Sequence, residues 1–249
     1  TCTSFTQSSG TFTSTSGTMT INAGAFNRTG GTFTHNSGTV VFGGNSSSGG
    51  TTTPGTSLTL YNVTFSQAGP QGEDQLTGTY NLAAGFTVAG NLTVQNTSDW
   101  DILRVQALTP NSNPTITVNG NLSFPSTPGS SSALNFGSSA GSANITVALA
   151  GNLSISDAQA NLYANVTFNG TGSQSVAKSA GVVSTGTWTV NKASGTLTPT
   201  TTLTITSDLT VTAGTFNQDT YAVSFGAMTI NGGTLTGGSQ SITCTSFTE

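Results

Sequence analysis

Apolar residues alternate with polar residues in short runs along the whole chain. In Thr18–Asn22, for example, Met19 and Ile21 fall on one side of an extended strand and the hydroxyl groups fall on the other. No helical period is present, and Gly, Asn, Ser and Pro interrupt the chain every few residues. The pattern predicts an all-β protein of short strands. The same two-residue period recurs in the apolar pairs Leu58/Leu60, Phe86/Val88, Leu92/Val94, Ile116/Val118, Leu122/Phe124, Val166/Phe168, Trp188/Val190, Leu203/Ile205, Leu209/Val211, Val223/Phe225, Met228/Ile230 and Ile242/Cys244.

Short motifs also repeat at locally regular spacing. The tetrapeptide that begins at Gly10 recurs at Gly31, and Gly-Asn-Leu recurs at Gly90, Gly120 and Gly151. Near the end of the chain, Gly-Thr motifs recur at even spacing, at Gly195, Gly214 and Gly233. A repeat of this length, with two or three strands, is typical of one coil of a parallel β-solenoid. We therefore predict a parallel β-helix of roughly a dozen coils, with the two ends of the chain at opposite ends of a rod.

A β-sandwich filament subunit is the alternative architecture. Short strands with frequent turns also fit one or two sandwiches in which a terminal strand completes the sheet of the next subunit. The regular local spacing favours the solenoid, although residues 70–115 depart from the pattern.

The hexapeptide TCTSFT occurs at residues 1–6 and again at 243–248. We interpret residues 1–249 as a single solenoid unit in which 243–249 begin the next copy. Contacts between units are then expected at Cys2, Phe5, Cys244 and Phe247. Each cysteine is expected to be a small buried hydrophobic residue, with two alternatives: a disulfide within one chain, which a closed sandwich would allow, or a covalent link between neighbouring units.

Composition narrows the class of protein. Lys+Arg 4 and Asp+Glu 8 give only 5% charged residues, against about 25% in ordinary globular domains. Four cations cannot neutralise many phosphates, so nucleic acid is not an expected partner. No apolar run is long enough to span a membrane, and without an initiator Met or an apolar signal segment we expect a processed chain or an internal fragment. A surface of hydroxyl groups and amides with almost no Lys or Glu argues against a cytoplasmic enzyme.

Three groups of segments resemble the strand-rich repeats of large secreted bacterial surface proteins, including filamentous-haemagglutinin-type adhesins. They are the Gly-Asn-Leu-Thr/Ser segments above, the run from Ser37 to Phe42, and the run from Asn165 to Gly170. The resemblance implies a right-handed parallel β-helix, secretion and an adhesive or structural role, and it carries over no catalytic residue. We expect a structural repeat unit of an extracellular fibre, adhesin stalk or surface filament, not an enzyme. Its expected partners are copies of itself end to end and surface glycans, and no cofactor is expected.

Ten Asn-x-Ser/Thr sequons occur, only slightly more than chance predicts. Three of them, at Asn91, Asn121 and Asn152, precede predicted strands and are expected at turns, where Asn tolerates a left-handed backbone. Glycosylation of an extracellular fibre remains the candidate role for the others. These are Asn27, Asn45, Asn62, Asn96, Asn144, Asn165 and Asn169.

Polysaccharide binding or cleavage is one alternative function. Its candidate acids are Asp99 and Asp101, which flank Trp100, and the Glu73/Asp74 pair, although solvated loop charges are the plainer interpretation. Neither pair has the pattern of a calcium loop. His35 lacks a partner at metal-binding spacing and is expected at the surface.

Ice binding is a second alternative, based on alternating threonines that would form a flat array if stacked in register. The repeat spacing is short near the N-terminus, longer in the middle and short again near the C-terminus, which argues against alignment, and threonine is also a common strand residue. The Thr-x-Thr segments are Thr11/Thr13, Thr18/Thr20, Thr32/Thr34, Thr115/Thr117, Thr196/Thr198, Thr204/Thr206 and Thr210/Thr212.

Overall fold

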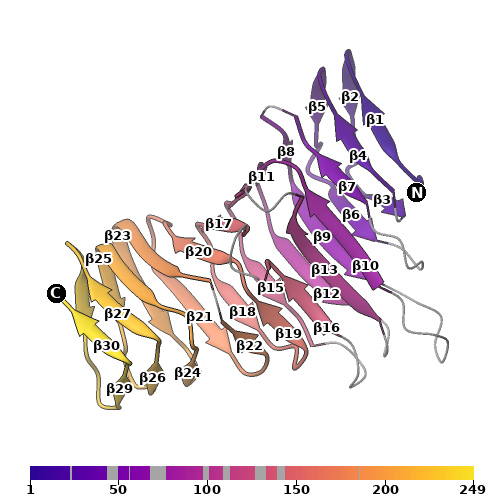
Figure 1. Ribbon diagram of the computed structural model, residues 1–249. Helices are drawn as coiled ribbons and strands as arrows, with labels where there is room; N and C mark the ends of the chain where they lie inside the picture. Colours follow the sequence, from indigo (N-terminus) through magenta and orange to yellow (C-terminus); the bar gives the residue numbers. More distant parts are fainter. Residues whose placement is uncertain are drawn as a thin grey trace.

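The strands stack in parallel to form a β-solenoid (Figure 1). The computed structural model describes residues 1–22, 24–43, 50–55, 57–67, 77–97, 101–108, 113–126, 133–138, 144–184 and 186–249, and no helix occurs within these ranges. Every strand pairing among them is parallel, which confirms the solenoid and excludes the sandwich alternative. The two termini lie at opposite ends of the rod, as predicted.

Each turn contributes strands to three faces, which we number after their first strand. Face 1 is one eight-stranded ladder followed along the rod by a three-stranded ladder. The first consists of β1 (Phe5–Gln7), β4 (Phe26–Arg28), β7 (Thr51–Thr53), β10 (Thr77–Leu82), β13 (Ile102–Ala107), β16 (Ala133–Phe136), β19 (Ala160–Leu162) and β22 (Val182–Val183). The second consists of β24 (Leu203–Thr204), β26 (Val223–Ser224) and β29 (Ile242–Thr243).

Faces 2 and 3 are joined into one sheet by two long strands that continue from one face to the other, β23 (Trp188–Pro199) and β25 (Leu209–Asn217), except that the first two strands of face 2 form a separate two-stranded ladder. The other strands of face 2 are β2 (Thr11–Thr13), β5 (Thr32–Thr34), β8 (Thr59–Leu60), β11 (Phe86–Val88), β14 (Thr115–Val118), β17 (Thr146–Leu149), β20 (Asn165–Phe168), β27 (Ala227–Ile230) and β30 (Ser246–Thr248). The other strands of face 3 are β3 (Thr18–Asn22), β6 (Thr39–Gly43), β9 (Asn62–Gln67), β12 (Leu92–Asn96), β15 (Leu122–Phe124), β18 (Leu153–Ile155), β21 (Gln174–Lys178) and β28 (Thr234–Thr236).

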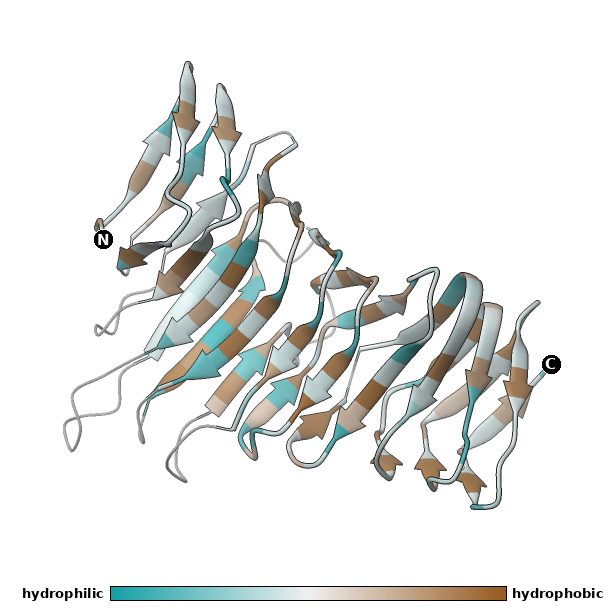
Figure 2. Ribbon diagram, turned by 180° about the vertical axis from the view of Figure 1, so that it is seen from behind, coloured by the Kyte–Doolittle hydropathy of each residue, from teal (hydrophilic) through white to brown (hydrophobic). Residues whose placement is uncertain are grey.

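The core is a set of apolar columns that run along the rod. On face 2, Ile116 pairs with Val147, which pairs with Val166, and this residue pairs with Trp188. All four side chains are fully buried. Figure 2 shows the same alternation as brown bands separated by paler or teal bands along the strands. Because the period of two puts the intervening residues outside, each coil adds one buried layer to its neighbours, and stability accumulates by stacking.

Several coils are longer than the spacing from Gly10 to Gly31 suggests. Leu92 pairs with Leu122, and Leu122 pairs with Leu153. The register of the columns is nevertheless kept across these long coils. The additional residues therefore fall in the connections between faces and not inside the strands.

Candidate functional site

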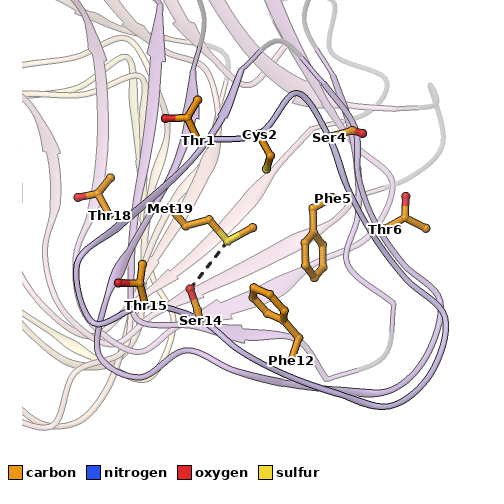
Figure 3. A pocket seen from close by; sticks show the side chains of 10 residues that line it. All are labelled: Thr1, Cys2, Ser4, Phe5, Thr6, Phe12, Ser14, Thr15, Thr18 and Met19. Carbon is orange, nitrogen blue, oxygen red and sulfur yellow. Dashed lines mark hydrogen bonds between the residues drawn. The ribbon is translucent and has the colours of Figure 1, made fainter.

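At the N-terminal end, the first coil leaves the apolar core open. Phe5 stacks on Phe26 with ring centroids 4.9 Å apart, and it meets Phe12 edge to face at 5.0 Å. Figure 3 shows Phe5, Phe12 and Met19 pointing into a common space, with Cys2 above it. This open cavity of about 520 Å³ is lined by Thr1, Cys2, Ser4, Phe5, Thr6, Phe12, Ser14, Thr15, Thr18 and Met19.

The C-terminal end is open in the same way. A cavity of about 370 Å³ there is lined by Ile230, Gly233, Thr234, Leu235, Phe247 and Glu249. Phe247 is 53% exposed, the largest value among the exposed large hydrophobic residues that the structure describes. In β30 this side chain continues the column of Trp188, Leu209 and Met228, so it lies over the core with no further coil to cover it in this structure.

The two copies of the hexapeptide lie at different corners of the solenoid. Cys2 forms a bridge with Ile21 of β3, on face 3, and Phe5 follows on face 1. At the other end, Cys244 follows β29 on face 1, and Phe247 lies in β30 on face 2. Identical sequences therefore make the same local turn into a strand but at corners one face apart. Residues 246–248 also complete the stack of this unit through pairing with β27, and a further copy beyond them stays a prediction.

Both cysteines are half-buried free thiols that pack against the core. They lie at opposite ends of the rod, so the alternative of a disulfide within one chain is wrong for this fold (Figure 1). The Cys2 thiol lies 3.7 Å from the carbonyl oxygen of Thr20, which it reaches as a weak donor.

Face 2 carries a column of outward-facing threonines that extends over most of the rod. The column alternates with the buried residues Val88, Val118 and Phe168, and its members pair in register from coil to coil. They are Thr59, Thr87, Thr117, Ala148, Thr167, Thr189, Thr210, Thr229 and Thr248. The prediction that changing coil length would prevent alignment is therefore wrong, because the length varies between faces and leaves the strand register unchanged.

A ladder of asparagine side chains follows the corner where face 3 begins. The Oδ1 atoms of Asn62, Asn91 and Asn121 accept hydrogen bonds of 2.8–2.9 Å from the backbone N–H of the asparagine one coil later, and Asn152 accepts one from Ser175. Asn91, Asn121 and Asn152 precede strands, as predicted, but none has a positive φ. The side-chain ladder, rather than a left-handed backbone, explains asparagine at these positions.

The remaining candidate glycosylation sites differ in exposure. Asn169 is exposed, whereas Asn27, Asn62 and Asn165 are half-buried. Asn96 is 3% exposed, and its amide donates to the carbonyl oxygen of Asp101 at 2.9 Å. The amide of Asn144 donates to the carbonyl oxygen of Tyr163. Asn45 lies outside the described residues.

Only one of the candidate acids lies within the described residues. Glu73, Asp74, Asp99 and Trp100 lie outside the described residues, and Asp101 is 2% exposed, which differs from the expected solvated loop charge. His35 is half-buried and stacks on Tyr61 with ring centroids 5.4 Å apart. Within the described ranges, no group of three or more His, Cys, Asp or Glu side chains is placed to hold a metal ion, and no helix has the length and apolar character needed to cross a membrane.

Comparison of the chain with protein-family models, curated proteins and solved structures finds no match. The class that the fold defines is that of parallel β-solenoids.

Proposed function

We propose that this chain is a structural unit of an extracellular fibre, adhesin stalk or surface filament, and that copies associate end to end. The single observation that carries the proposal is that the apolar core continues to the first and last described coils, where Phe5, Phe12 and Phe247 can pack against a further coil of the same cross-section. A parallel strand edge is satisfied by another strand of the same direction in the same cross-section. The opposite end of an identical solenoid has strands of the same direction and the same cross-section.

In head-to-tail stacking, each face at the C-terminal end of one copy would meet the same face at the N-terminal end of the next copy. Face 2 ends at β30 and begins at β2, so with the faces aligned Phe12 of one copy would cover Phe247 of the copy below. Face 1 ends at β29 and begins at β1, so these two strands would lie one over the other. This contact is heterologous and does not close on itself, so it generates a filament and not a dimer.

Composition supports an extracellular structural role. A formal net charge of −4 spread over 249 residues leaves little electrostatic repulsion between stacked copies. The asparagine ladder ties successive coils together from Asn62 to Ser175, and the threonine column stays in register from Thr59 to Thr248, which suits a protein whose task is mechanical rather than catalytic.

Sedimentation velocity over a range of concentrations tests end-to-end association. We expect the wild-type chain to form a concentration-dependent series of species, and Phe247→Glu to remain a monomer because the charge would be buried at the junction. Val182→Glu is the matched control, because Val182 is 49% exposed on the side of the rod in face 1 and lies in β22, remote from both ends. A wild-type chain that stays monomeric at millimolar concentration, or equal loss in both variants, would refute the proposal.

The threonine column favours a second function, binding to an ice surface through ordered water. Eight threonines and one alanine share the column on face 2, with methyl and hydroxyl groups repeating every coil, about 4.8 Å apart. Measurement of thermal hysteresis tests this function. Activity that is lost in Thr210→Lys and kept in Thr198→Lys, which lies in the face 3 part of β23, would support it. No hysteresis in the wild-type chain would exclude it.

A further inference from the structure

Face 1 carries a small, mostly polar hollow on its outer surface, remote from both open ends. The hollow has a volume of about 90 Å³ and lies across three consecutive strands or their ends, β13, β16 and β19. It is lined by Arg104, Gln106, Asn135, Gly137, Ser138 and Tyr163.

A glycine creates this hollow. Val105 pairs with Phe136, which pairs with Leu162, so the next outward position along the three coils holds Gln106, Gly137 and Tyr163 in turn. Gly137 leaves a gap between the two larger side chains. Any other residue at this position would be strained, because φ is 96° and a Cβ would lie only 2.5 Å from the backbone nitrogen of Ala164.

The wall of the hollow is held in place by one asparagine. Asn144 Oδ1 accepts hydrogen bonds from the backbone N–H of Ser138 at 3.1 Å and of Ile145 at 2.9 Å, and its amide donates to the carbonyl oxygen of Tyr163. Both edges of the gap are therefore fixed to a common side chain. A ligand would meet a preformed shape, which lowers the entropic cost of binding.

Arg104 is the most accessible cation of the chain. Of the four Lys and Arg residues, Arg28 is 8% exposed and Lys192 is 1% exposed, Lys178 is half-buried, and Arg104 alone is exposed. Within the described residues, the guanidinium group has no hydrogen-bond or ion-pair partner. Its planar set of donors matches the two oxygens of a carboxylate.

The neighbouring amides leave one donor and one acceptor for a ligand. Asn135 accepts from Asn161 Nδ2 at 2.9 Å through its Oδ1, which leaves the Asn135 amide nitrogen as a donor. Gln106 donates from Nε2 to Asn81 at 3.0 Å, which leaves its Oε1 as an acceptor. A cation, a donor, an acceptor and the ring of Tyr163 together suit a sugar that carries both hydroxyl groups and a carboxylate.

We propose that this hollow binds a uronic acid unit of an acidic polysaccharide. A volume of about 90 Å³ admits the carboxylate and one edge of the sugar, while the polymer continues over the amide side chains of face 1. Because the protein has a formal net charge of −4, non-specific attraction cannot explain binding to a polyanion. The proposal adds a ligand to the structural role and does not depend on end-to-end association.

Affinity electrophoresis of the whole chain tests the proposal, with polygalacturonate, dextran sulfate or neutral galactan in the gel. We expect polygalacturonate to retard the wild-type protein, with at least about tenfold weaker retardation for Arg104→Gln. Lys178→Gln is the matched control, because it removes the same charge from face 3, and it should be retarded like the wild type. Equal melting temperatures for the three proteins would establish that the variants are folded.

Four outcomes would overturn the proposal. They are no retardation of the wild type by polygalacturonate, equal retardation by galactan, retardation by dextran sulfate alone, and equal retardation of Arg104→Gln and the wild type. The Phe247→Glu variant separates this test from that of the proposed function, because it should lose self-association and keep its retardation.

Discussion

Asn91 accepts, through its side-chain Oδ1, a hydrogen bond of 2.8 Å from the backbone N–H of Asn121, one coil later in the chain. Asn121 in turn accepts one from the backbone N–H of Asn152. One side chain thus provides the acceptor that a backbone N–H at the corner of the next coil needs. The ladder ties the longest coils together at a position where the strand hydrogen bonds are interrupted.

Asn121→Ala removes one step of this ladder and should lower the free energy of unfolding by about 0.5–1.5 kcal/mol. Asn121→Asp keeps the acceptor oxygen and should retain most of the stability at neutral pH. Asn119→Ala is the control in the same turn, because Asn119 is exposed and bonds to the neighbouring coil through its backbone N–H. Urea denaturation measures all three. A loss for Asn119→Ala as large as that for Asn121→Ala would argue against the ladder.

The alternation of side chains predicted an all-β protein, and the spacing of the repeats favoured the solenoid over the sandwich. Pairs such as Ile116/Val118 specify one buried face in each strand. The recurrence of Gly-Asn-Leu at Gly90, Gly120 and Gly151 places equivalent corners one coil apart. A single buried layer in each repeat can be satisfied only by stacking on the next, so local patterns determine the architecture.

The surfaces were harder to predict because they depend on which residues of different coils share a column. Thr117 and Thr167 belong to one column although the coils between them differ in length, and the sequence alone does not show where the extra residues fall. The hollow at Gly137 was missed for the same reason. Its residues come from three coils, and the only local signal is a glycine directly after an alternating run.

Lys192 is buried where the rod has few other charges. It shares one acceptor, Oε1 of Gln174, with the backbone N–H of Gly170. Its Nζ donates to the carbonyl oxygen of Gly170 and to Oε1 of Gln174, both at 2.6 Å, and burial lowers the pKa of this amine. A double-mutant cycle of Lys192→Met and Gln174→Leu should give a coupling energy of about 1–3 kcal/mol in urea denaturation. Additive effects of the two substitutions would show that the contact contributes nothing.

Glycosylation should distinguish the sequons by exposure. When the chain is expressed in a eukaryotic secretory pathway, we expect a glycan on Asn169, which is exposed, in the folded, secreted protein. Asn96 should be unmodified in that protein, because its buried amide bonds to the carbonyl oxygen of Asp101 and a glycan there would prevent folding. Peptide mass spectrometry measures the glycan occupancy of both asparagines. Occupancy of Asn96 in the secreted, folded fraction would contradict the structure.

Tyr80 should make the protein sensitive to alkaline pH. Its side chain is 1% exposed, its hydroxyl has no hydrogen-bond partner in the part of the chain that the structure describes, and burial raises the pKa of Tyr80 to about 12. In the unfolded chain the pKa is about 10. Between these two values the unfolded state releases the proton and the folded state retains it, so stability falls as pH rises. The contribution of Tyr80 to the free energy of unfolding is fully present below pH 10. By pH 12 we expect this free energy to fall by about 2–3 kcal/mol.

Tyr80→Phe should remove this loss and should leave stability at pH 8 unchanged or higher by about 1 kcal/mol, because an unpaired buried hydroxyl disappears. Tyr221→Phe is the control, since Tyr221 is 37% exposed. The urea midpoint of each protein, measured between pH 8 and pH 11, tests the expectation. Both variants keep the lysines of the wild type, so a difference between their pH profiles isolates the ionisation of Tyr80. Identical profiles for Tyr80→Phe and the wild type would mean that this phenol does not govern alkaline unfolding.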